Sequence, residues 1–201
     1  QNGNIDLSGL DRNRIGVIWG SGNGGIQTFN DEMMNFAANG AVPRFNPFFI
    51  PKIIADIASG VISIKHGLRG INFTTMSACA TSTTAIIEAF NHIKWGKANM
   101  VITGGSEAPI TQAAIGGFNA LKALSTRNDA PKGASRPFDR DRDGFVMGEG
   151  AGILVLESRD HALKRGAKIY AELVGFGSAA DAYHITAPDP SGDGAVRAMR
   201  A

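Results

Sequence analysis

Residues 71–96, INFTTMSACATSTTAIIEAFNHIKWG, join a strand pattern to a helix pattern without a linker. Ile71–Met76 is short and β-prone and predicts a strand, whereas Thr81–Trp95 predicts a helix that Gly96 closes. The small residues between them, SACA, carry the only cysteine of the chain, Cys79. A cysteine at such a junction would sit on a sharp turn that points its side chain outward.

The same alternation of strands and helices extends on both sides of this unit. The pattern predicts further strands at Arg14–Trp19, Met100–Thr103, Gly152–Leu156 and Ile169–Phe176, helices at Gln27–Ala38, Pro51–Lys65, Ala113–Leu124 and Arg159–Arg165, and a long polar loop at Ser125–Phe145. Short apolar strands alternating with helices indicate an α/β fold in which helices cover a sheet.

The composition and net charge of the chain indicate which classes of binding partner are not expected. The chain has 201 residues, which suits one domain or most of one, and 43% of them are hydrophobic, which allows a substantial core. A formal net charge of +2, from 20 basic and 18 acidic residues, gives no reason to expect nucleic acid or an anionic membrane as partner. No apolar run approaches the roughly 20 residues that span a bilayer, and no signal peptide is recognisable, so we expect a cytoplasmic protein.

The single cysteine has two interpretations. It cannot form an internal disulfide, and a zinc site would need several more soft ligands. At the start of a helix, Cys79 would lie near unpaired N–H groups and the positive end of the helix dipole, which favour the reactive thiolate. Most free cysteines, however, are small buried apolar residues. Position alone leaves both interpretations open.

Four stretches decide between them: TMSACATS (75–82), GGSEA (104–108), ALSTRN (123–128) and RPFDRDRDGFVMGEGAGILVLE (136–157). Together they resemble the β-ketoacyl-acyl carrier protein synthases, the condensing enzymes of fatty-acid synthesis in the thiolase-like superfamily. The resemblance implies a layered α-β-α-β-α fold, incomplete in this chain. It also implies that residues 1–201 form a partial synthase domain, with most of the N-terminal half and the start of the C-terminal half.

The resemblance also implies an activity. In the family, the cysteine that matches Cys79 accepts an acyl chain from acyl carrier protein as a thioester, and its backbone N–H supplies one oxyanion-hole donor. A malonyl unit on another carrier protein then loses carbon dioxide and attacks that thioester. Covalent catalysis of this kind splits one difficult condensation into two easier steps. The family enzymes are homodimers, and the resemblance implies neither a cofactor nor a metal.

Further positions match residues that bind substrate in the family. Phe118 resembles an aromatic residue lining the acyl pocket, and Asn23 lies about where the family places a residue that limits chain length. Phe49 and Ile54 resemble residues that reach the partner subunit's pocket, and Thr186 resembles a contact at the mouth of the pantetheine channel. Asn23 can equally be a turn residue among glycines.

Two basic positions, Arg44 and Lys122, match family positions that meet the acidic carrier protein. Either can instead be a solvated surface charge, the commoner role of such residues.

Two other site types fit poorly. Asp139–Gly150 imitates a calcium loop, but Glu149 lies one residue before the position of the bidentate ligand. Gly20–Gly25 follows a strand but lacks the spacing of a dinucleotide loop.

The four histidines of the chain do not account for the later steps of the family's reaction. None of His66, His92, His161 and His184 lies in either of the two histidine motifs that the family uses for decarboxylation and condensation. We therefore expect these 201 residues alone to be inactive in condensation. A polyketide ketosynthase and a non-catalytic fragment or partner subunit remain alternatives, although silent partners often replace the cysteine.

Overall fold

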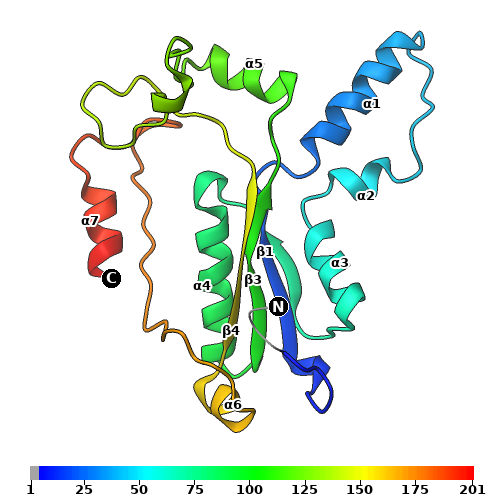
Figure 1. Ribbon diagram of the computed structural model, residues 1–201, viewed down its shortest axis with the longest axis vertical. Helices are drawn as coiled ribbons and strands as arrows, with labels where there is room; N and C mark the ends of the chain where they lie inside the picture. Colours follow the sequence, from blue (N-terminus) through cyan, green and yellow to red (C-terminus); the bar gives the residue numbers. More distant parts are fainter. Residues whose placement is uncertain (1–4) are drawn as a thin grey trace. The chain divides into compact units, whose positions relative to one another are not determined.

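The computed structural model describes residues 5–201, in which four strands form one mixed sheet (Figure 1). The strands are β1 (Ile15–Gly20), β2 (Asn72–Thr75), β3 (Met100–Glu107) and β4 (Gly150–Glu157), in the order β2-β1-β3-β4. Strand β1 runs parallel to β2 and β3, and β4 runs antiparallel to β3. The register places Gly20 beside both Thr75 and Gly105, so the carboxyl ends of three strands meet at one end of the sheet.

The α-helices are α1 (Ile26–Ala38), α2 (Phe49–Ile53), α3 (Ile57–His66), α4 (Thr81–Lys94), α5 (Gln112–Ala120), α6 (Arg159–Lys164) and α7 (Asp193–Arg200). Short 3-10 turns occupy Arg12–Arg14, Ala78–Ala80 and Pro131–Gly133. None of the helices in residues 5–201 has the length and apolar character of a membrane-spanning segment. The chain divides into two compact units, one running to His161 and the other from Ala162 to Ala201.

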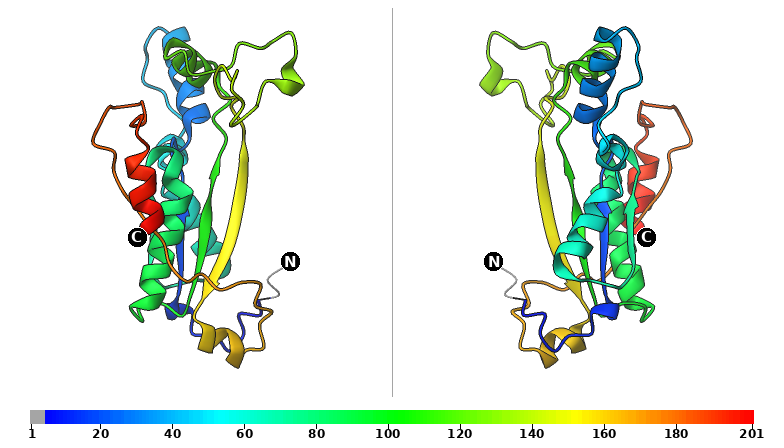
Figure 2. Two further views of the ribbon diagram at one scale, coloured as in Figure 1. Left: turned by 90° about the vertical axis from the view of Figure 1, so that its left-hand side faces the viewer. Right: turned by 90° about the vertical axis from the view of Figure 1, so that its right-hand side faces the viewer.

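The core of the first unit lies on both faces of β1, whose six residues are all buried. Alternate strand residues point to opposite faces. Ile18 packs with Ala85 and Ala89 of α4, whose small side chains allow the helix to approach closely. Val17 belongs to a second cluster, against which Ile62 of α3 packs. Figures 1 and 2 show α4 on one face of the sheet and α3 on the other, an α-β-α arrangement.

Most predicted elements are present, with ends that differ by a few residues, but the single helix expected at Pro51–Lys65 is wrong. The segment divides into α2 and α3, because Ile54 is extended, with φ −70° and ψ 125°. The carbonyl oxygen of Ile53 accepts the Gly25 N–H at 3.2 Å, and that contact takes the place of a helical partner. Tertiary contact with the Gly20–Gly25 loop therefore overrides the helical periodicity.

The second unit departs most from the sequence-based expectation. Ile169–Phe176 was expected to be a strand and is not, because no strand of residues 5–201 pairs with it. Apolar, β-prone side chains specify a strand only where a neighbour supplies backbone hydrogen bonds. Helix α7 was not predicted at all.

Candidate active site

Cys79 lies where β2 meets α4, as the sequence predicts. It is exposed and occupies the 3-10 turn Ala78–Ala80, which leads directly into the helix. Ala78 has φ 48°, in the left-handed region that residues with a Cβ seldom adopt. Such a conformation persists only where the surroundings hold it, and it makes the turn sharp enough to present the thiol.

Hydroxyl groups hold this turn. Thr81 Oγ1 donates to the Ala78 carbonyl at 2.6 Å and accepts the Ser77 N–H at 2.9 Å. Thr75 Oγ1, at the end of β2, donates to the Thr81 carbonyl at 3.0 Å. The threonines of the motif therefore fix the backbone on both sides of Cys79.

Glycines let the start of α4 rest directly on the sheet. A Cβ on Gly20 would lie 3.0 Å from the Ser82 backbone. A Cβ on Gly105 would lie 2.7 Å from the Gly20 carbonyl oxygen and would overlap Ser82 Oγ. Both distances are shorter than a normal contact, so the two glycines determine how far Cys79 stands from the strands.

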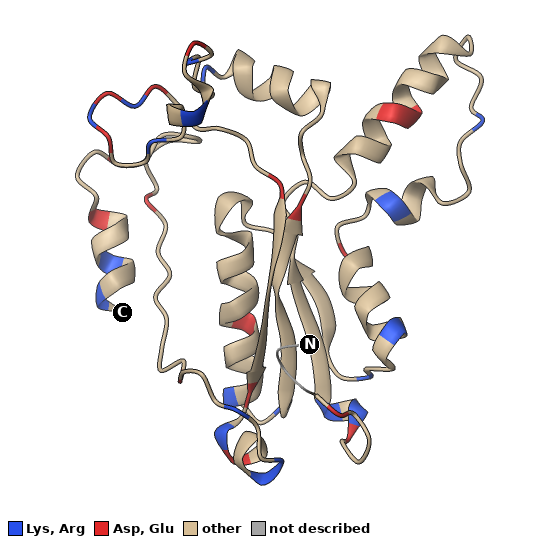
Figure 3. Cartoon of the chain, viewed as in Figure 1, with Lys and Arg blue, Asp and Glu red and all other residues tan. Residues whose placement is uncertain are grey.

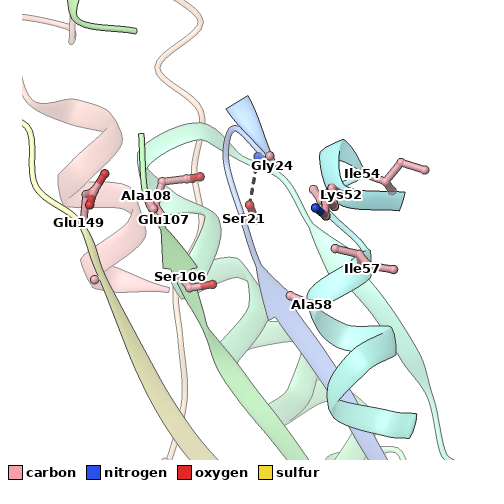
Figure 4. A pocket seen from close by; sticks show the side chains of 13 residues that line it. Ser21, Gly24, Lys52, Ile54, Ile57, Ala58, Ser106, Glu107, Ala108 and Glu149 are labelled. Atoms are coloured by element: carbon pink, nitrogen blue, oxygen red, sulfur yellow. Dashed lines mark hydrogen bonds between the residues drawn. The ribbon is translucent and has the colours of Figure 1, made fainter. Parts of the chain in front are cut away.

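Asn23 lies on the Gly20–Gly25 loop that follows β1, and its side chain is exposed. The loop borders a pocket of about 430 Å³ at the carboxyl end of the sheet. Figure 4 shows Ile54 and Lys52 on one side of this pocket and Glu107 and Glu149 on the other. The structure thus brings the Asn23 loop and Ile54 to one cavity.

Phe118, on α5, packs edge-on against Phe145 with ring centroids 5.2 Å apart. The backbone of Phe145 is tied to the segment after α5, because its N–H donates to the Ala123 carbonyl at 3.0 Å and its carbonyl accepts the Ser125 N–H at 3.0 Å. Lys122 lies between α5 and the Ala123–Ser125 segment that Phe145 binds. Its side chain is exposed, and its backbone φ is 54°.

Asp143 organises the polar loop predicted at 125–145, where Figure 3 shows charges of both signs. Its carboxylate accepts from Ser125 Oγ at 2.7 Å and from the Thr126 N–H at 2.9 Å, and it pairs with Arg136 at 3.1 Å. The Ser125 and Thr126 hydrogen bonds hold the pKa of Asp143 below its usual value. Within residues 5–201, no group of three or more His, Cys, Asp or Glu side chains could hold a metal ion.

Phe49 is only 9% exposed and stacks on Phe45 of its own chain, with ring centroids 5.2 Å apart. Its reach into a partner subunit's pocket stays a prediction. Arg44 lies in the exposed segment that joins α1 to α2.

Thr186 belongs to the second unit. His184 Nδ1 accepts the N–H groups of Thr186 at 3.1 Å and Ala187 at 3.0 Å, which closes a small turn and leaves the Thr186 side chain exposed. In the first unit, His161 contacts Glu157, and His92 packs edge-on against Trp95. These histidines therefore have local structural contacts.

One residue of the site was missed from the sequence. Glu107, the last residue of β3, accepts the Gly22 N–H at 2.6 Å and the Asn23 N–H at 3.1 Å. A carboxylate at the end of a buried strand, in GGSEA, was the available signal. Nothing in the sequence indicated which loop it would bind.

Comparisons with known proteins agree with the geometry. Residues 1–162 match the family model "Beta-ketoacyl synthase, N-terminal domain". A 3-oxoacyl-[acyl-carrier-protein] synthase 2 from Staphylococcus aureus is 53% identical over 98% of this chain and 47% of its own length. A protein of the same name from Synechocystis is 50% identical over 96% of this chain and 46% of its own length. The chain thus spans about half the length of these relatives.

Solved structures extend the likeness to the fold. A β-ketoacyl synthase from Burkholderia phymatum has a TM-score of 0.85 at 35% identity, covering 98% of this chain and 48% of that one. A type II polyketide ketosynthase bound to its acyl-carrier protein has a TM-score of 0.88 at 32% identity, covering 98% of this chain and 50% of that one. The expected α/β, thiolase-like fold class is confirmed, and the α-β-α layers around one sheet are the part of it present here. The chain therefore belongs to the β-ketoacyl synthase family, whose N-terminal domain it matches over residues 1–162.

Proposed function

We propose that the protein acts as a 3-oxoacyl-[acyl-carrier-protein] synthase of fatty-acid elongation, with Cys79 as the nucleophile. The observation that carries the proposal is the exposed Cys79 on a sharp turn at the start of α4, in a chain 53% identical to a synthase of that name. We treat residues 1–201 as one partial synthase domain of the full-length protein.

The reaction begins with acyl transfer. The Cys79 thiol loses its proton, and the thiolate attacks the thioester carbonyl of an acyl chain on acyl carrier protein. The bond from that carbonyl to the carrier's sulfur then breaks, and the carrier's sulfur takes up the proton. Charge develops on the carbonyl oxygen, and the Cys79 N–H would donate one hydrogen bond to it. A malonyl thioester on a second carrier protein then loses carbon dioxide, and the resulting carbanion attacks the carbonyl carbon of the Cys79 thioester. The new carbon–carbon bond forms as Cys79 leaves as the thiolate.

The remaining site residues are assigned to substrate and carrier. Asn23 and Phe118 would bound the acyl chain, and support comes from the pocket beside the Asn23 loop and from the packing of Phe118 on Phe145. Phe49 and Ile54 would reach the partner subunit's pocket across the dimer interface, and Thr186 would contact pantetheine. Arg44 and Lys122, both exposed, would meet the acidic carrier protein.

The full-length protein is further proposed to be a cytoplasmic homodimer. Strand β2 is an outer strand of the sheet, so its free edge could pair with the β2 of a second copy across an isologous interface. Sedimentation of the full-length protein at micromolar concentration should give a dimer, and a monomer would contradict this part of the proposal.

A polyketide ketosynthase is the second candidate, because the neighbour bound to a hexaketide has a TM-score of 0.88. Sequence favours fatty-acid elongation, with 53% identity to a 3-oxoacyl synthase against 32% to that ketosynthase. A non-catalytic partner subunit is less favoured because Cys79 is present.

Competition between carrier thioesters tests the assignment. The full-length protein, offered equal amounts of a saturated acyl and a polyketo acyl carrier thioester with malonyl carrier protein, should release carbon dioxide and elongate the saturated chain. Preference for the polyketo chain would favour the second candidate function, that of a polyketide ketosynthase. Absence of both elongation and carbon dioxide release would leave only the non-catalytic assignment.

A further inference from the structure

The loop after β1 is bound from the side by the end of β3. The register that places Gly20 beside Gly105 brings Glu107 next to this loop. One carboxylate oxygen of Glu107 accepts two consecutive backbone N–H groups, from Gly22 at 2.6 Å and from Asn23 at 3.1 Å. Hydrogen bonds to an ionised acceptor are about twice as strong as neutral ones, and Glu107 is partly buried. The carboxylate therefore fixes the backbone that carries Asn23.

The same loop touches the turn that carries the nucleophile. A Cβ on Gly22 would lie 3.0 Å from Glu107 Oε2, 3.7 Å from the Ala78 carbonyl oxygen and 4.0 Å from Thr81 Oγ1. Gly22 therefore lies between the Glu107 carboxylate and the turn that carries Cys79. Displacement of the loop would change the space beside the nucleophile and would also move Asn23.

The other hydrogen bonds around the loop do not bind the Gly22–Asn23 backbone to β3, as the Glu107 carboxylate does. Ser21 Oγ accepts the Gly24 N–H at 3.2 Å, which closes the loop on itself but does not tie it to β3. Gly25 N–H donates to the Ile53 carbonyl at 3.2 Å, which ties the far end of the loop to α2. Glu149, across the same end of the sheet, accepts the Ile110 N–H at 3.0 Å.

We propose that Glu107 is a positioning residue that sets acyl-chain-length selectivity, by holding the Gly22–Asn23 backbone against the turn that carries Cys79. The inference rests on the proposed function, because it needs Cys79 to accept acyl chains and Asn23 to bound them. A difference of one methylene in an apolar pocket changes discrimination by about 10-fold to 200-fold. A small movement of the loop should therefore alter the ranking of chain lengths more than it alters acyl transfer itself.

The experiment uses the full-length protein and measures kcat/KM for acylation by C8 and C16 carrier thioesters. Glu107→Ala should change the C16-to-C8 ratio by about 10-fold or more. Glu107→Gln keeps a neutral acceptor of the same length, so its change should be smaller than that of Glu107→Ala but still more than about twofold. Iodoacetamide should alkylate Cys79 at the wild-type rate, within about twofold, in both variants, because the thiol itself is not moved away from solvent.

Asp11→Ala is the matched control. One oxygen of Asp11 also accepts two N–H groups at 3.0 Å, both from Asn13, but at the opposite end of β1. This variant should leave the C16-to-C8 ratio unchanged. If Glu107→Ala does not fold, the ratio in Glu107→Gln decides.

Three results would overturn the inference: a ratio within about twofold of wild type, an equal loss at both chain lengths, or the same change in Asp11→Ala. Each of these requires acylation of Cys79 in the wild-type protein. Failure of the proposed function is a different result, because then no carrier thioester acylates Cys79 in any variant.

Discussion

Gly105→Ala should crowd β1 and the start of α4, and it should lower the stability of the protein. The added Cβ would lie 2.7 Å from the Gly20 carbonyl oxygen and would overlap Ser82 Oγ. Ser82 can rotate away, but the Gly20 carbonyl is part of the buried strand β1 and cannot. Close approaches of carbon to carbonyl oxygen are normally about 3.3 Å or more, so β3 must move away from β1 by about 0.6 Å at this point.

The expected loss of stability follows from two opposing effects. Overpacking of a close-packed interior costs about 1–3 kcal/mol, and contact with a backbone atom puts this site near about 3 kcal/mol. Replacing glycine with alanine restores about 0.4–1 kcal/mol by restricting the unfolded chain. The free energy of unfolding should therefore fall by about 2 kcal/mol.

Urea unfolding of the full-length protein, followed by tryptophan fluorescence, measures this change. Trp19 lies on β1 beside Gly104 and donates to Ser106 Oγ at 3.0 Å, so it reports on the affected strands. Gly60→Ala is the control, because a Cβ there meets open space on α3 and should stabilise the helix by about 0.5–1 kcal/mol. An unfolding free energy of Gly105→Ala within about 0.5 kcal/mol of wild type would refute the close approach of Gly105 to the Gly20 carbonyl of β1 and to Ser82 of α4.

Two further substitutions probe the loop and the pocket. Asp143→Asn should lower the thermal midpoint at neutral pH. Because the folded-state pKa of Asp143 is depressed, its stabilisation is present above the unfolded value of about 3.9 and is lost as pH falls through the folded value. The difference between variant and wild type should accordingly shrink in acid, and a constant difference from pH 7 to pH 2 would contradict this linkage. Asn23→Phe should shorten the longest acyl chain accepted, because the added side-chain volume, on the loop that borders the pocket, would take up space that the acyl chain needs. An unchanged chain-length profile would mean that Asn23 does not bound the acyl chain.

Local patterns predicted the central part of the fold well. Cys79 lies between β2 and α4, as expected, because a β-prone segment, a small-residue turn and a helical segment follow one another directly and need no distant partner. The loop at 125–145 was also expected, but its anchor at Asp143 depends on hydrogen bonds to Ser125 and Thr126 at the other end of the loop, which local patterns do not predict.

Tertiary contacts explain what the sequence could not reveal. The break at Ile54 arises where Gly25 binds the Ile53 carbonyl. Within residues 5–201, no strand pairs with Ile169–Phe176, although its composition is typical of a strand. Phe49 matches a family position by motif, but periodicity could not predict that it would stack on Phe45. Glu107 could be read as the end of a strand, but its hydrogen bonds to the Asn23 loop depend on strand order.

The most direct measurement is the site of acylation. Full-length wild-type protein and Cys79→Ala would each be incubated with a long-chain acyl carrier thioester, digested and analysed by mass spectrometry. We expect one acyl adduct in the wild-type protein, on the peptide that contains Cys79, and none in Cys79→Ala. Undiminished acylation of Cys79→Ala at another residue would contradict the assignment of Cys79 as the nucleophile.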